Sequence, residues 1–162
     1  MGIILLLIFI LPFIAISRSR KKKEQSFITA LNSLAEKSNC NITEYETWHN
    51  RAIGIDKNAH KLFFLQRAAN YTTEKEINLT ETEKCHAEKT NRTMKQGKET
   101  YSVIEKLELA FQLRDKQQSE TLLEFYNVEK DSLTPAEELR LLEKWLEISK
   151  SSIANAKLSQ LK

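Results

Sequence analysis

Three histidines and two cysteines are the residues of this chain whose types suit metal binding or nucleophilic chemistry. His49, His60, His86, Cys40 and Cys85 show none of the short spacings that bring such ligands together, such as C-x-x-C, H-x-x-x-H or H-E-x-x-H. Cys85 and His86 are neighbours, and neighbours on a strand point to opposite faces of the sheet. We therefore expect no metal site and no cofactor.

The sequence also lacks the common patterns of nucleophilic catalysis. It contains no G-x-S-x-G motif, and beyond residue 23 its only glycines are Gly54 and Gly97, too few for a glycine-rich phosphate loop. We predict a protein that is not an enzyme. An enzyme that uses Cys85 as nucleophile, with His49 or His60 as base, is an open alternative.

An apolar run, IILLLIFILPFIAIS, opens the chain between Gly2 and Ser17. As a helix rising about 1.5 Å per residue it would measure roughly 24 Å, somewhat less than the roughly 30 Å of a bilayer's hydrocarbon core. No basic residue precedes the run, whereas a secretory signal peptide carries its positive charge in front. The five basic residues that follow it are Arg18, Arg20, Lys21, Lys22 and Lys23.

Because basic flanks stay on the cytoplasmic side, this asymmetry predicts a single-pass protein of the cell membrane. Residues 1–23 would be a transmembrane anchor with the N-terminus outside. Residues 24–41, with apolar side chains at helical spacing, would form an amphipathic helical stalk. Residues 42–162 would form one cytoplasmic domain.

The charge balance argues against a nucleic-acid-binding protein. The net charge of +3 comes from 25 basic and 22 acidic side chains, and five of the basic ones belong to the membrane-flanking cluster. The remainder is slightly acidic, which is not the electrostatic footprint of a nucleic-acid binder. The partners we expect are the membrane lipid bilayer and an unknown protein.

Residues 42–128 carry strand patterns. The clearest spans residues 103–113, where Leu107, Leu109, Phe111 and Leu113 alternate with Glu108, Ala110 and Gln112. The other strands are expected at residues 42–48, 51–56, 61–66, 76–80, 82–90 and 120–128. We expect the polar residues 91–100 to form an excursion between strands.

A helix is predicted after residue 133. Thr134 would be its N-cap, Pro135 its first residue and Glu137 the reciprocal capping side chain. An apolar stripe centred on Trp145 then extends almost to the C-terminus, and a stripe of this width is typical of a helix that covers a sheet. Trp145 is therefore the expected core tryptophan.

These elements predict an α+β fold: an N-terminal transmembrane helix, then an antiparallel sheet or small barrel of about seven strands capped by a C-terminal helix. The AIGID and KLFF strands, the LELAFQL and LLEFY strands and the EELRLLEKWLEIS helix together resemble the pleckstrin-homology-like superfold, in particular its small bacterial membrane-anchored versions. The short segment His49 to Arg51 departs from the basic loop of the lipid-binding members.

Two functions follow from these patterns. The first is a membrane-anchored, non-enzymatic interaction module, which could bind a peptide at an early edge strand bearing Tyr45 and Trp48. The alternative is an exported or lumenal small ligand-binding domain, tethered by the same apolar segment or released from it. Pairing of Cys40 with Cys85, or glycan addition at the four N-x-S/T sequons, would favour this alternative. The sequons begin at Asn41, Asn70, Asn78 and Asn91.

Overall fold

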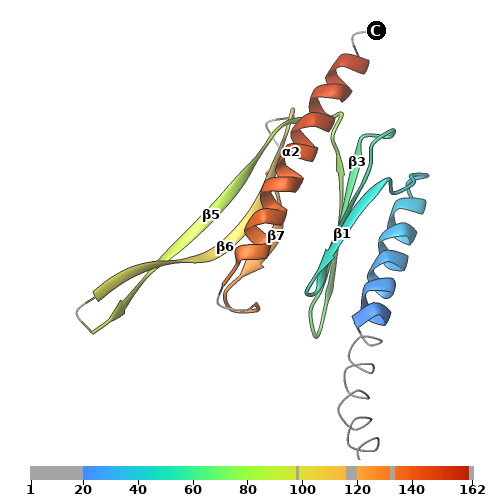
Figure 1. Ribbon diagram of the computed structural model, residues 1–162. Coiled ribbons are helices and arrows are strands. Elements are labelled where there is room, and N and C mark those ends of the chain that lie inside the picture. Colours follow the sequence, from blue (N-terminus) through green and yellow to red (C-terminus); the bar gives the residue numbers. More distant parts are fainter. Residues whose placement is uncertain (1–19, 98, 116–119, 132–133, 161–162) are drawn as a thin grey trace, which may run out of the picture.

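The computed structural model describes residues 20–97, 99–115, 120–131 and 134–160. Two antiparallel sheets and two helices make up this part of the chain (Figure 1). The first helix is seen from residue 20 to residue 36 and is called helix 20–36 below. The strands are β1 (Glu44–Trp48), β2 (Arg51–Asp56), β3 (Lys61–Arg67), β4 (Thr72–Asn78), β5 (Thr82–Gln96), β6 (Glu99–Leu113) and β7 (Thr121–Asn127), and the second helix is α2 (Ala136–Ser159).

Sheet A contains β1 to β4 in sequence order, and its two central strands are buried on both faces. In the β2–β3 register Ile53 pairs with Phe64, and their side chains enter the main core between the two sheets. The next pair along the register, Ala52 with Leu65, points to the opposite face. Near-continuous apolar strands such as these are expected where both faces of a sheet are covered.

Helix 20–36 covers the outer face of sheet A (Figure 1). Phe27 and Leu31 on the helix pack with Phe63 and Leu65 of β3 in a second, smaller core. Gly54 marks the closest approach, because a Cβ there would lie 2.8 Å from Leu31 Cδ2. The segment predicted as a stalk thus contributes side chains to the interior of the domain.

Sheet B contains β5, β6 and β7, and α2 lies along it (Figure 1). Leu141, Leu142 and Trp145 of α2 are almost fully buried in the main core, together with Phe111 and Phe125 of sheet B. The core tryptophan anticipated from the sequence, Trp145, has no exposed surface. Helix α2 therefore closes the main core on the side of sheet B.

The predicted fold class needs two corrections. The strands form two separate sheets and no closed barrel within the described residues. The physical cause is a tight corner after β4, where the Asn78 side chain accepts hydrogen bonds from the backbone N–H and hydroxyl of Thr80. Thr82 donates to the Asn78 carbonyl, so β5 starts in sheet B without pairing with β4.

The second correction concerns the transmembrane helix. Residues 1–19, which include the apolar run and Arg18, lie outside the described residues. Among the helices that the structure describes, none combines the length and apolarity that crossing a bilayer requires. Helix 20–36 begins its described part with a turn of exposed cationic residues and buries only one face.

The helix cap predicted at Thr134 and Glu137 is wrong by one residue. Helix α2 begins at Ala136, and its N-cap residue is Pro135, with no side-chain hydrogen bond to the helix terminus. The Pro135 carbonyl accepts the first helical hydrogen bond from Leu139 N–H at 3.0 Å. Thr134 and Glu137 therefore form no reciprocal cap, and the helix is stabilised by the packing of Leu141, Leu142 and Trp145 in the main core.

Candidate functional site

A pocket of about 430 Å³ lies where the start of helix 20–36 meets the β1–β2 turn. We call it the junction pocket, and its lining residues are Arg20, Lys23, Glu24, Phe27, Thr47, Trp48 and His49. Its volume lies in the range of small-ligand sites. The pocket combines cations from the helix with aromatic and imidazole side chains from the helix and the turn.

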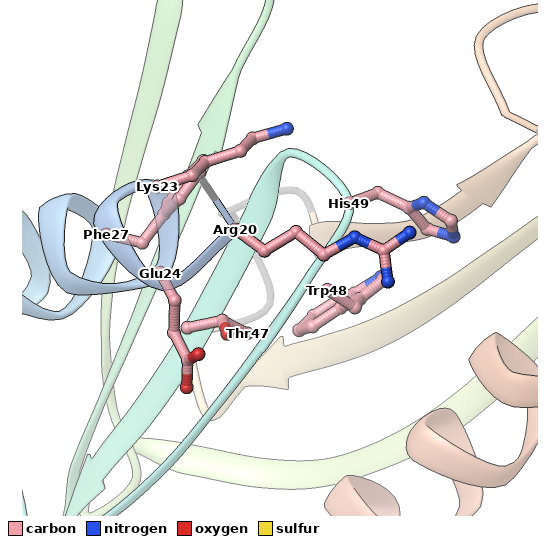
Figure 2. A pocket seen from close by; sticks show the side chains of 7 residues that line it. All are labelled: Arg20, Lys23, Glu24, Phe27, Thr47, Trp48 and His49. Atoms are coloured by element: carbon pink, nitrogen blue, oxygen red, sulfur yellow. The ribbon is translucent and has the colours of Figure 1, made fainter. Parts of the chain in front are cut away.

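Figure 2 shows the Arg20 side chain running from the helix toward Trp48 and His49. Within the described part of the chain, the Arg20 guanidinium has no hydrogen-bond or ion-pair partner. Lys23 Nζ donates to Asn50 Oδ1 at 2.8 Å, which ties the helix to the turn. A guanidinium without a partner in the described residues and an ammonium with further donors can together bind a carboxylate or phosphate group.

The far wall of the junction pocket is held in place by contacts to α2 and sheet B. His49, whose φ is +45°, lies with Nε2 2.7 Å from Oε1 of the buried Glu138 on α2. Trp48 donates from Nε1 to the Phe125 carbonyl at 3.0 Å and stacks on the Phe125 ring with centroids 4.8 Å apart. The pocket wall is therefore rigid on the side of the turn.

Next to the turn, a buried ionic cluster joins the two sheets. Arg51 of β2 is 2% exposed, and its guanidinium lies 2.9 Å from both carboxylate oxygens of Asp131. It also donates to Glu124 Oε1 of β7 at 3.0 Å. A buried charge is tolerated only when it is paired and hydrogen-bonded in this manner.

The same cluster shifts the ionisation of Glu124. Burial alone would raise the pKa of this carboxyl group, but hydrogen bonds from Asn127, Gln66, Lys130 and Arg51 outweigh burial and lower the pKa to about 2. Glu124 is therefore a carboxylate at any pH at which the protein is folded in cells. It acts as the acceptor that holds the two sheets together at this end of the molecule.

Of the membrane-flanking cluster, the structure describes Arg20, Lys21, Lys22 and Lys23, all of them exposed on helix 20–36. Only Arg20 and Lys23 line the junction pocket. Within the described residues, no group of three or more His, Cys, Asp or Glu side chains is placed to hold a metal ion.

Cys40 and Cys85 are free and buried, in the smaller core and the main core respectively. They lie on opposite sides of sheet A, so a disulfide between them would require the sheet to rearrange. His60 lies elsewhere, with Nδ1 3.2 Å from the hydroxyl of Ser152 on α2. His86 is exposed on β5. Among the described residues no hydrogen bond joins Cys85 to His49 or His60, whose side-chain partners are Glu138 and Ser152.

Tyr45 and Trp48 are the two residues expected on an edge strand, and only Tyr45 is exposed. β1 is an edge strand of sheet A, as the peptide-binding hypothesis required, and the Tyr45 side chain is 47% exposed. Trp48 is 6% exposed and belongs to the main core. β1 ends at the junction pocket, which Thr47 and Trp48 help to line, and Lys144 of α2 forms ion pairs with Glu44 and Glu46 on the same strand.

Comparisons with family models, with curated proteins and with solved structures find no match to this chain. The resemblance to the pleckstrin-homology-like superfold thus stays a prediction.

Two residues of this region escaped the sequence analysis, although a signal for each exists. Arg51 shares a strand face with Ile53 and Ile55, two and four residues later, which implies burial. Glu138 lies seven residues before Trp145 and thus on the buried face of α2. In both cases the strand or helix periodicity places a charged residue among core positions. Such a placement indicates a buried ion pair.

Proposed function

We propose that the protein is a membrane-anchored, non-enzymatic interaction module whose domain faces the cytoplasm. The observation that carries the proposal is the packing of helix 20–36 on sheet A directly after the apolar run and the basic cluster. Because this helix is part of the domain, attachment of the preceding apolar residues to a bilayer would hold the whole domain close to the membrane surface.

Cell fractionation tests the attachment. The full chain should stay in the membrane pellet after an alkaline carbonate wash. A variant with Leu5, Leu6 and Leu7 replaced by Asp should move to the soluble fraction, because charged side chains are costly in hydrocarbon. Recovery of the unmodified chain in the soluble fraction would contradict the anchor.

The orientation is tested with a single cysteine appended after Lys162, in a variant with Cys40 and Cys85 replaced by Ser. A membrane-impermeant maleimide should label it only in permeabilised cells. Labelling of intact cells would favour the exported alternative, for which the exposed sequon residues Asn41, Asn70 and Asn91 would be accessible sites.

The surface that we assign to a protein partner is the outer edge of β1, which pairs with no further strand in the described residues, together with the junction pocket. Lys144 of α2 contacts the Glu44 and Glu46 side chains of this strand, so a partner would reach the edge from the side of Tyr45. An edge strand presents unpaired backbone groups to which an extended segment can add as a further strand. Tyr45 is exposed beside this edge, and Arg20, which has no partner among the described residues, lines the pocket at its end. The partner that fits is an extended segment carrying a carboxylate or phosphate group at the position that enters the pocket.

Site-specific crosslinking in cells tests this surface. A photoreactive phenylalanine analogue at Tyr45 should yield one discrete protein adduct, whereas the same analogue at Leu158, an exposed residue near the C-terminus of α2, should not. Arg20→Gln should reduce the yield at least about fivefold, since a charge-assisted hydrogen bond contributes about 1.5 to 3 kcal/mol.

Lys22→Gln is the matched control, because it removes the same charge from the same helix outside the junction pocket. Its adduct yield should stay close to that of the unmodified chain. Equal yields from Tyr45 and Leu158, or equal losses in the two charge variants, would rule out this surface.

A further inference from the structure

The far half of the β5–β6 hairpin extends beyond the rest of sheet B (Figure 1). The register of β7 on β6 ends at the pair Asn127 and Lys106, so residues 91–96 and 99–104, which we call the arm, form a two-stranded ribbon. An isolated two-stranded ribbon has only marginal stability in water. Because β7 does not extend along the arm, the side chains of the arm remain available for contact with another surface.

The arm has two chemically different faces. Met94 pairs directly with Tyr101, and the next pair on the same face is Arg92 with Val103. Met94 is 37% and Tyr101 40% exposed, among the largest exposed fractions of apolar side chains in the described residues. The opposite face carries Thr93, Ser102, Lys95 and Thr100, and it is polar except at its base, where Ile104 packs against the main core.

The position of the arm points to what covers the first face. In Figure 1 the far end of the arm and the start of helix 20–36 both lie at the lower end of the molecule, on opposite sides of the view. The nineteen residues before that point include the apolar run, which the proposed function places in a bilayer. Arg67 donates to Ser26 Oγ at 2.8 Å, so the β3 end of sheet A and the exposed Tyr71 beyond it lie at this end too.

The side-chain chemistry of this face matches a bilayer surface. Tyrosine is enriched at the membrane–water interface because its ring is amphipathic, and methionine is flexible and apolar. Arg92 is exposed on this face, Lys95 is exposed on the opposite face of the same narrow ribbon, and cations near an anionic leaflet contribute about 1 kcal/mol each to attraction.

We propose that the face of the arm formed by Met94, Tyr101, Val103 and Arg92 lies on the headgroup region of an anionic bilayer. The domain then has two membrane contacts, the N-terminal segment and the arm, which together determine its orientation on the membrane. This inference rests on the proposed anchoring, and its test separates the failure of one from the failure of the other.

The test uses the full chain with Cys40 and Cys85 replaced by Ser, reconstituted into phosphatidylcholine vesicles with or without 30% phosphatidylglycerol. Single cysteines at Met94, Tyr101, Thr93, Lys23 and Leu158 carry an environment-sensitive fluorophore, and lipids with a nitroxide near the headgroup act as quencher. Labels at positions 94 and 101 should be quenched at least about twofold more than labels at positions 93 and 158 when phosphatidylglycerol is present. Arg92→Gln combined with Lys95→Gln should remove most of the gain caused by phosphatidylglycerol.

Three outcomes would overturn the proposal. Equal quenching at positions 93 and 94 would mean that the arm has no oriented membrane face. Quenching at Lys23 without quenching at 94 and 101 would refute the arm contact while leaving the anchor intact. Absence of quenching at Lys23 as well would refute the anchoring and the arm contact together.

Discussion

Sheet A and the arm are antiparallel structures in the same chain, yet their surroundings are opposite. The central strands of sheet A are buried on both faces, between helix 20–36 on one side and sheet B with α2 on the other. The arm is exposed along most of its described length. The comparison shows that helix 20–36, which follows the basic cluster, belongs to the packed part of the molecule. The exposed part is the arm, which extends from sheet B.

The largest expected effect is in the main core beside sheet A. Trp145→Ala should lower the free energy of unfolding by about 3 to 5 kcal/mol, because a fully buried indole is replaced by a cavity. Urea denaturation of the detergent-solubilised full chain measures it. Trp145→Phe is the control, since it keeps a ring and removes an indole N–H that has no partner among the described residues. Equal stability of Trp145→Ala and the unmodified chain would contradict the core assignment.

Acidification should weaken the cluster that joins sheet A to sheet B. The pKa of Glu124 is lowered from 4.5 to about 2 in the folded protein, so its stabilisation is complete above pH 4.5 and is lost as the pH falls toward 2. A shift of this size corresponds to about 3 kcal/mol. Urea unfolding between pH 6 and pH 2.5 measures the loss.

Glu124→Gln is the control for the acid experiment. The variant should be less stable at pH 6, because Arg51 loses a charged partner, and its stability should depend less steeply on pH. A residual slope is expected from Asp56 and Glu76, whose pKa values are also lowered. Identical slopes for the variant and the unmodified chain would show that Glu124 is not the responsible group.

Substituting a glycine of sheet A and a glycine at the end of the arm compares the two regions directly. Gly54→Ala should cost about 1 to 3 kcal/mol, because its Cβ would meet Leu31 of helix 20–36 and Ile42. Gly97→Ala should cost about 1 kcal/mol, because the φ of Gly97 is +63° while the space around it is open. Only Gly54→Ala should loosen helix 20–36, detected as faster hydrogen exchange of that helix. Equal effects of both variants on the helix would contradict its close packing.

The smallest effect is expected from removing the arm. Replacing residues 93–102 by Asn-Gly would close the hairpin between the paired Arg92 and Val103 with a favourable two-residue turn. The free energy of unfolding should change by less than about 1 kcal/mol, because the side chains whose burial is described in residues 93–102 are all exposed. A larger loss in urea denaturation would show that the arm supports the core.

The central strands of sheet A were predictable because their apolar side chains form a recognisable strand pattern between turn residues. Residues 51–56 and 61–66 were expected as strands and correspond to β2 and β3 within one residue. The prediction of a polar excursion at residues 91–100 was wrong, since β5 continues to Gln96 and β6 begins at Glu99. Backbone hydrogen bonds extend the register of the hairpin there without a buried face, and no apolar pattern signals this.

The candidate site was predictable only in part. The basic cluster stands out in the sequence, but the pairing of its Arg20 and Lys23 with the β1–β2 turn depends on how helix 20–36 packs against sheet A. That packing uses a glycine and a pair of phenylalanines far apart in the chain, Gly54, Phe27 and Phe63. Side-chain contacts between distant segments leave no local pattern, and this is why the segment read as a stalk.

Hydrogen exchange of helix 20–36 in the full chain, reconstituted in phosphatidylcholine nanodiscs, tests the central claim most directly. If the helix is an integral layer of the domain, amides of residues 27–35 should exchange as slowly as those of β2 and β3, because both open only when the cores unfold. Exchange of these amides at the rate of an unprotected peptide, with β2 and β3 still protected, would contradict the account and return the helix to the role of a stalk.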